Sequence, residues 1–143
     1  MSNVKARNGK GYEFIVFGYL IRNGFDLYQT IVDDQGIDGI LRYVNPERGI
    51  ANYFEIQVKG ARAFSQIRVS LSSLPDNVLL FMYSEKDDIV IWLFGSDINN
   101  YFQNKGMNIS DIQLKNSIVN ELINSGYSSL DKLIEKLNLF QNE

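Results

Sequence analysis

Alternating apolar and polar residues mark a β-strand at residues 51–59 of the chain. In its second half the apolar positions are Phe54, Ile56 and Val58, and the polar positions between them are Glu55, Gln57 and Lys59. Because successive side chains of a strand point to opposite faces, we expect the apolar set to face the core and the polar set to face away from it. A carboxylate, an amide and an ammonium group in one row indicate either an ordinary solvent-exposed face or the lining of a functional site.

A helix and further strands surround this strand in the predicted fold. Apolar residues at helical spacing predict a helix over residues 9–22, which the pair Asn23-Gly24 ends. The predicted strands span residues 25–32, 37–44, 51–59, 78–83 and 89–94. A turn with Pro and Gly joins the second of these to the third, which predicts an antiparallel hairpin. Residues 60–74 fit either a strand followed by one helical turn or a longer helix.

Helices are expected after the last strand. Residues 96–102 form a short helix candidate. Ser110 and Gln113 have the spacing of a capping box, which predicts a helix from Ser110 to about residue 125. A last helix begins near Ser128. The order of elements predicts an α/β (α+β) fold with a mixed sheet of about five strands, preceded by one helix and followed by C-terminal helices.

Length and composition are those of one domain. The chain has 143 residues, 45% of them hydrophobic, which suits a single domain over residues 1–143. No apolar run approaches the roughly 18 residues of a membrane span. The polar N-terminus lacks the apolar segment of a secretory signal. We therefore expect a cytoplasmic protein without membrane association.

The chain contains no cysteine and no histidine, and this absence narrows the chemistry. Disulfides, thiolate metal sites, Ser-His-Asp triads and imidazole bases are all excluded. Any catalysis must come from carboxylates, amides, hydroxyls and ammonium groups. The metals that suit oxygen ligands alone are hard cations such as magnesium, manganese or calcium.

Charge is unevenly distributed along the sequence. The formal net charge of −3 argues against a generally basic nucleic-acid-binding protein. Lys and Arg outnumber Asp and Glu nine to seven in residues 1–70, whereas acidic residues outnumber basic ones ten to five in residues 71–143. A polyanionic partner would therefore meet the N-terminal half. Ordinary variation of surface charge accounts for so small an asymmetry equally well.

Four polar residues form a candidate site on the predicted helix and hairpin. Glu13 lies within the first helix, Asp38 at the start of the second strand, and Gln57 and Lys59 near the end of the third. The start of one antiparallel strand meets the end of the next, so Asp38 is expected close to Gln57 and Lys59. Asp38 and Gln57 would present oxygens to a hard cation, and Lys59 would place its ammonium near a water or a phosphate oxygen. Taken alone, Asp38 is explained equally well by a turn role, and Glu13, Gln57 and Lys59 are explained better by a surface role, so the combination carries the prediction.

In this order the residues resemble the PD-(D/E)XK nuclease superfamily. The match consists of a helical Glu, an Asp, and then an acidic or amide residue followed two positions later by Lys on a hairpin. The pattern "GIDG…QVKG" looks like a branch of uncharacterised prokaryotic nucleases, some linked to restriction or phage defence, in which Gln replaces the acidic residue. The resemblance covers roughly residues 8–95 as the nuclease core and leaves about residues 96–143 as a C-terminal helical extension.

The resemblance also implies roles for these residues. Asp38 and Gln57 would bind a divalent metal, Mg²⁺ or Mn²⁺. Lys59 would position or activate the attacking water, and Glu13 would assist. Gln57 departs from the main pattern, because a neutral amide oxygen binds magnesium more weakly than a carboxylate does. Glu55, on the same face of the strand, is a substitute for the missing charge. Whether the site binds one metal ion, two or none stays open.

The implied function is hydrolysis of phosphodiester bonds in nucleic acid, with DNA favoured over RNA. Since one chain has one candidate site, a homodimer is expected where both strands of a duplex are cut. The alternative is an inactive nuclease fold that serves as a binding or regulatory subunit. Residues that could contact phosphates or stack on bases, or equally be ordinary surface residues, are Arg62, Arg68, Tyr12, Tyr19, Tyr28 and Tyr43.

Overall fold

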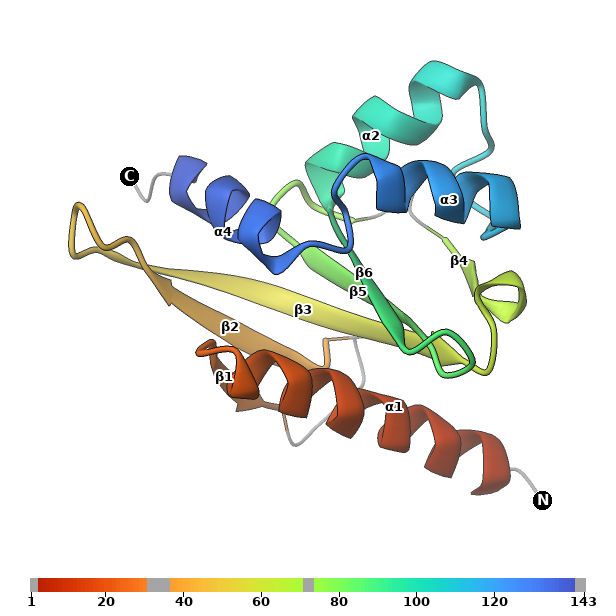
Figure 1. Ribbon diagram of the computed structural model, residues 1–143, viewed down its shortest axis with the longest axis horizontal. Coiled ribbons are helices and arrows are strands. Elements are labelled where there is room, and N and C mark those ends of the chain that lie inside the picture. The colour runs from red at the N-terminus through yellow and green to blue at the C-terminus, as the bar shows by residue number, and fades with distance from the viewer. Residues whose placement is uncertain (1–2, 31–36, 71–73, 141–143) are drawn as a thin grey trace.

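The computed structural model describes residues 3–30, 37–70 and 74–140. Its elements follow each other along the chain as shown in Figure 1. They are α1 (Asn3–Arg22), β1 (Asp26–Gln29), β2 (Gly39–Val44), β3 (Ala51–Ala61), the short 3₁₀ helix η1 (Phe64–Gln66), β4 (Arg68–Val69), β5 (Leu79–Ser84), β6 (Ile89–Phe94), α2 (Gly95–Phe102), the 3₁₀ helix η2 (Gln103–Lys105), β7 (Ile112–Gln113), α3 (Asn116–Asn124) and α4 (Leu130–Leu139).

The main sheet has five strands in the order β1-β2-β3-β5-β6. All neighbours are antiparallel except β3 and β5, which are parallel. The hairpin of β2 and β3 is therefore confirmed, and so is the α+β class with a mixed sheet. A parallel pair needs a crossover connection, and the segment with η1 and β4 supplies it.

Two hydrophobic cores lie on the two faces of this sheet. α1 and α4 cover one face, where they pack on the apolar residues of β3 and on every second residue of β5 and β6. α2 and α3 cover the other face, over the alternate residues of β5 and β6 (Figure 1). All six residues of β5 are buried, as its uninterrupted apolar sequence requires.

Strand β3 keeps the alternation that the sequence shows. Phe54, Ile56 and Val58 belong to the core under α1 and α4. The residues between them point to the other face, where Glu55 and Lys59 are exposed and Gln57 is half-buried.

The helix predicted from Ser110 is wrong at its start. The Ser110 N–H and hydroxyl both donate to the Asn108 side-chain oxygen, at 3.1 and 2.6 Å, and close a local turn instead of capping a helix. Ile112 and Gln113 then form β7, which pairs with β4. α3 begins only at Asn116, so pairing with a segment distant in sequence overrides the local signal.

Other boundaries differ by a few residues. The first helix begins at Asn3, ahead of the predicted residue 9, and β2 begins at Gly39, so that Asp38 precedes the strand. The first strand covers Asp26–Gln29, and residues 31–32 of its prediction lie outside the described ranges. None of the helices in the described ranges has the length and apolarity that crossing a membrane requires.

Candidate functional site

Strand β3 brings Gln57 and Lys59 to one cavity. They pair in parallel register with Leu80 and Met82 of β5, and since they are two residues apart their side chains leave the same face. The cavity has a volume of about 180 Å³. Its lining consists of Gln57, Lys59, Arg68, Val69, Ser70, Leu74 and Leu80.

Asp38 is held against the same strand by backbone hydrogen bonds. Its N–H donates to the Ile56 carbonyl at 2.9 Å, while its own carbonyl accepts from Thr30 at 3.2 Å, so the residue bridges towards both neighbouring strands. The Asp38 Oδ2 atom accepts from the Val58 N–H at 2.7 Å. This short charge-assisted bond fixes the carboxylate beside the backbone between Gln57 and Lys59.

Helix α1 reaches this end of the hairpin because residue 39 is glycine. A Cβ atom at Gly39 would lie 3.0 Å from the Phe17 ring and 2.8 Å from the Tyr28 carbonyl oxygen. Glu13 stands one helical turn before Phe17, on the same side of α1. Its carboxylate accepts from Lys10 Nζ at 3.4 Å.

The predicted site residues are thus brought together in part. Gln57 and Lys59 share a cavity, and Asp38 is tied to their strand through Val58. Glu13 lies on the helix that covers the opposite face of β3. Glu55 faces the same side as Gln57 but is exposed, opposite Ile40. That Asp38, Gln57 and Glu13 converge on one cation stays a prediction.

The donor set suits a hard cation by its chemistry. Asp38 and Glu13 are carboxylates with only 7% of each residue exposed, and Gln57 adds an amide oxygen. Oxygen donors alone select magnesium, manganese or calcium. Among the residues that the structure describes, no group of three His, Cys, Asp or Glu side chains is arranged to hold a metal. A site here would therefore depend on the Gln57 amide.

Arg68 adds a positive charge to the rim of the cavity. It comes from β4, and its guanidinium pairs with Asp111 at 3.2 Å between two exposed side chains. Such a surface pair contributes little, so a phosphate could take the place of Asp111 at small cost. Ser70 and Leu74 also line the cavity and were not predicted, because residues 60–74 carry no clear periodicity; Leu80 comes from the predicted strand 78–83, whose place beside β3 the sequence did not predict.

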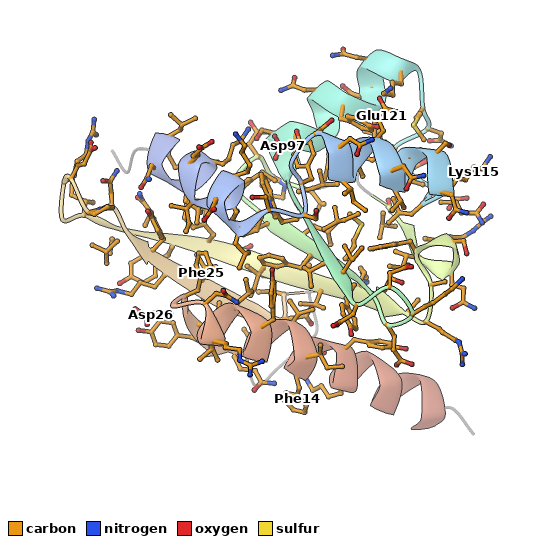
Figure 2. All side chains as sticks on the ribbon, in the orientation of Figure 1. Phe14, Phe25, Asp26, Asp97, Lys115 and Glu121 are labelled. Atoms are coloured by element: carbon orange, nitrogen blue, oxygen red, sulfur yellow. The ribbon has the colours of Figure 1, made fainter. Side chains whose placement is uncertain are left out.

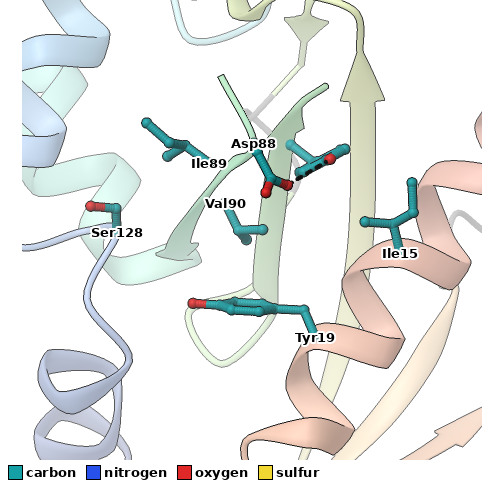
Figure 3. Close-up of a pocket in the computed structure, with 7 residues that line it drawn as sticks. Ile15, Tyr19, Asp88, Ile89, Val90 and Ser128 are labelled. Atoms are coloured by element: carbon teal, nitrogen blue, oxygen red, sulfur yellow. Dashed lines mark hydrogen bonds between the residues drawn. The ribbon is translucent and has the colours of Figure 1, made fainter. Parts of the chain in front are cut away.

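A second cavity of about 220 Å³ lies on the α1 side of the sheet (Figure 3). It is bounded by Ile15 and Tyr19 of α1, by the turn between β5 and β6, and by Ser128. The Tyr83 hydroxyl donates to Asp88 at 3.0 Å beside it. Burial, followed by this hydrogen bond, raises the pKa of Tyr83 to about 12. None of the predicted site residues lines this cavity.

Comparison with known proteins shows the fold. No protein-family model matches the chain, and no curated protein sequence matches it. Among solved structures, the chain is similar to that of a bacterial homing endonuclease, I-Ssp6803I, with a TM-score of 0.58 and 15% sequence identity. The match covers 94% of this chain and 95% of that one. The shared fold therefore extends past residue 95 into the C-terminal helices, beyond the core that the sequence resemblance covers.

Proposed function

We propose that the chain is a metal-dependent nuclease of the PD-(D/E)XK type, with Gln57 at the acidic position of the motif. Its substrate would be a phosphodiester bond of nucleic acid, DNA in the first place. The observation that carries the proposal is the Asp38 carboxylate, bonded to the Val58 N–H between Gln57 and Lys59. A fold shared with a homing endonuclease supports it.

Each residue has a distinct role in this proposal. Asp38 and Gln57 would hold Mg²⁺ or Mn²⁺, while Glu13, on the helix over the opposite face of β3, would assist from that side of the strand. The cation would polarise the scissile phosphate and lower the pKa of a bound water. Lys59 would orient the attacking water and offset the negative charge that grows on the phosphate. Arg68, at the rim of the same cavity, would bind a neighbouring phosphate.

The test compares hydrolysis by the wild-type protein with that by Asp38→Asn and Lys59→Met. Single-stranded, duplex and branched DNA and RNA are assayed with Mg²⁺ or Mn²⁺. The amide introduced by Asp38→Asn keeps an oxygen acceptor for the Val58 N–H, so the fold should persist while the charge is lost. We expect each variant to lose about 100-fold or more in rate, as for other groups that stabilise transition-state charge.

A matched control is Lys132→Met, which removes an exposed lysine of α4 whose partner is the equally exposed Glu135. Its activity should equal that of the wild type. Hydrolysis that is unchanged in both Asp38→Asn and Lys59→Met would contradict the assignment of the site.

The second candidate is a nuclease fold that binds without cleaving. The neutral Gln57 favours it, because an amide oxygen binds magnesium more weakly than a carboxylate does. Calorimetric titration with Mg²⁺ and Mn²⁺ separates the two functions. Binding that Asp38→Asn abolishes supports the nuclease, whereas absence of binding at millimolar metal supports the binding subunit.

We expect two copies of the chain to act together where both strands of a duplex are cut. Sedimentation of the protein bound to a duplex tests this.

A further inference from the structure

On the face of the sheet that carries Gln57, no described helix covers β1, β2 or the first half of β3. On this face, α2 and α3 pack over β5 and β6, and the core they form includes no residue of β1 or β2 within the described ranges. Tyr28 of β1 and Tyr53 of β3 stand on it with 56% and 58% of their surfaces exposed. Arg42 of β2 lies directly opposite Tyr53. We call these three residues the tyrosine platform.

Strand register sets the spacing of the platform. Tyr28 pairs with Ile40, which pairs with Glu55, so Tyr28 lies two strands and two residues away from Tyr53. Strand spacing and rise place their Cα atoms roughly 12 Å apart. Two aromatic rings at this distance cannot cover each other, so each presents a face of its own to a ligand.

Arg42 interacts with residues of both neighbouring strands. Its Nη1 atom lies 3.3 Å from the Asp26 carboxylate. A hydrogen bond with Tyr53 raises the pKa of the guanidinium above its ordinary value. Because Asp26 offsets Arg42, the platform carries little net positive charge.

The platform continues into the candidate site along β3. Tyr53, Glu55, Gln57 and Lys59 follow at every second residue and share one face. From Tyr53 to Lys59 the strand rises roughly 20 Å. A nucleic-acid strand whose phosphate lies at Gln57 and Lys59 can therefore extend over Tyr53 within a few nucleotides.

We propose that the tyrosine platform stacks unpaired bases of a single-stranded segment of the nucleic-acid substrate. This rests on the proposed function, since the platform would hold the strand that the site cleaves. Exposed aromatics on an open sheet are a surface on which bases stack. Because Asp26 offsets Arg42 and Glu55 adds a negative charge, the platform does not attract the closely spaced phosphates of a duplex. The substrate class is thus a single strand, or a duplex with an unpaired flank.

The test uses single-stranded DNA that contains 2-aminopurine, with EDTA present so that no hydrolysis occurs. Stacking on the platform quenches the fluorescence of this base, and anisotropy reports the affinity. Tyr28→Ala and Tyr53→Ala should each weaken binding by about five-fold or more and reduce the quenching. Tyr28→Phe and Tyr53→Phe keep a ring and should behave as the wild type.

Phe14→Ala is the matched control. Phe14 is 56% exposed and projects from α1, away from the sheet (Figure 2). Its removal should leave both signals unchanged. Because all three aromatic residues are largely exposed, the Ala variants should also keep their melting temperatures, which distinguishes loss of stacking from loss of fold.

The outcomes separate the platform from the nuclease. If hydrolysis requires Lys59 but the Tyr→Ala variants bind and quench as the wild type does, the platform is overturned and the nuclease stands. If no hydrolysis occurs but the Tyr→Ala variants lose binding, the nuclease fails and base stacking stands. Absence of binding to single strands by the wild type overturns the platform. So does a dimer that dissociates in the Tyr→Ala variants without any change in quenching, because the face would then be an interface between two copies.

Discussion

Gly60, directly after Lys59, lets α1 lie against the backbone of β3. A Cβ atom at this position would lie 2.5 Å from both Cβ and Cγ of Tyr12. No flexible chain end could give way there, because the atoms that would be met are the base of the ring. The absence of one methyl group thus sets how closely the first helix approaches the strand that carries the candidate site.

Gly60→Ala should therefore destabilise the protein. Forcing a methyl group into a filled contact costs about 1–3 kcal/mol in the free energy of unfolding. Gly18→Ala is the control: no heavy atom lies within 4 Å of its added Cβ, and alanine in a helix is favoured over glycine by about 1 kcal/mol. In urea unfolding, the midpoint of Gly60→Ala should lie below that of the wild type, and the midpoint of Gly18→Ala should lie above it. Equal shifts would show that the contact with Tyr12 relaxes without cost.

At the scale of elements, local sequence patterns predict the features that depend on interactions between residues close in sequence. The alternation in β3 and the turn before it predict the hairpin and the face of Gln57 and Lys59. Ser110 shows the limit, because its capping signal is outweighed by the pairing of Ile112 with Val69, a partner 43 residues away. The fold class and the strands were therefore accessible from the sequence, whereas the small sheet of β4 and β7 was not.

The candidate site, too, contains features that the sequence predicts and features that it does not. Strand parity predicts that Gln57 and Lys59 leave one face, and the structure has them so. The bond from Val58 to the Asp38 carboxylate depends on the backbone turning between two strands, which no periodicity reveals. The cavity lining from Ser70 and Leu74 depends on the crossover connection, whose pattern is ambiguous.

Tyr83 of the β5–β6 hairpin should lower the stability of the protein at alkaline pH. The pKa of Tyr83 is raised to about 12 in the fold, against 10.0 for an unperturbed tyrosine. The folded state therefore holds the proton more tightly than the unfolded state, so this stabilisation is complete below pH 10 and is lost as the pH rises towards 12. Tyr83→Phe cannot ionise and should lose less stability over that interval. Urea midpoints at pH 8 and pH 11.5 test this, and an identical loss in both proteins would contradict it.

At the scale of the whole molecule, the two cores are joined at Asp97. This residue of α2, labelled in Figure 2, is 4% exposed, and its Oδ2 atom accepts from the Phe94 N–H at 2.9 Å. Its Oδ1 atom accepts from Lys136 Nζ of α4 at 2.8 Å. Since α2 belongs to one core and α4 to the other, the ion pair links the layers on the two faces of the sheet.

Lys136→Met should uncouple these layers by leaving the Asp97 charge buried without its cation. Removing one partner of a fully buried pair costs about 3–5 kcal/mol; the Lys136 side chain is 34% exposed, so solvent screening lowers the expected cost to about 1–3 kcal/mol. Adding Asp97→Asn removes the charge but keeps an acceptor for Phe94, so the double variant should recover part of the loss. Urea unfolding of both single variants and the double variant measures the coupling, and strictly additive effects would show that the two residues do not interact.

Neither Asp97 nor Lys136 lines the cavity of Gln57 and Lys59. The nuclease activity of the fraction that stays folded should therefore equal that of the wild type, which separates the stability of the layers from the chemistry of the site.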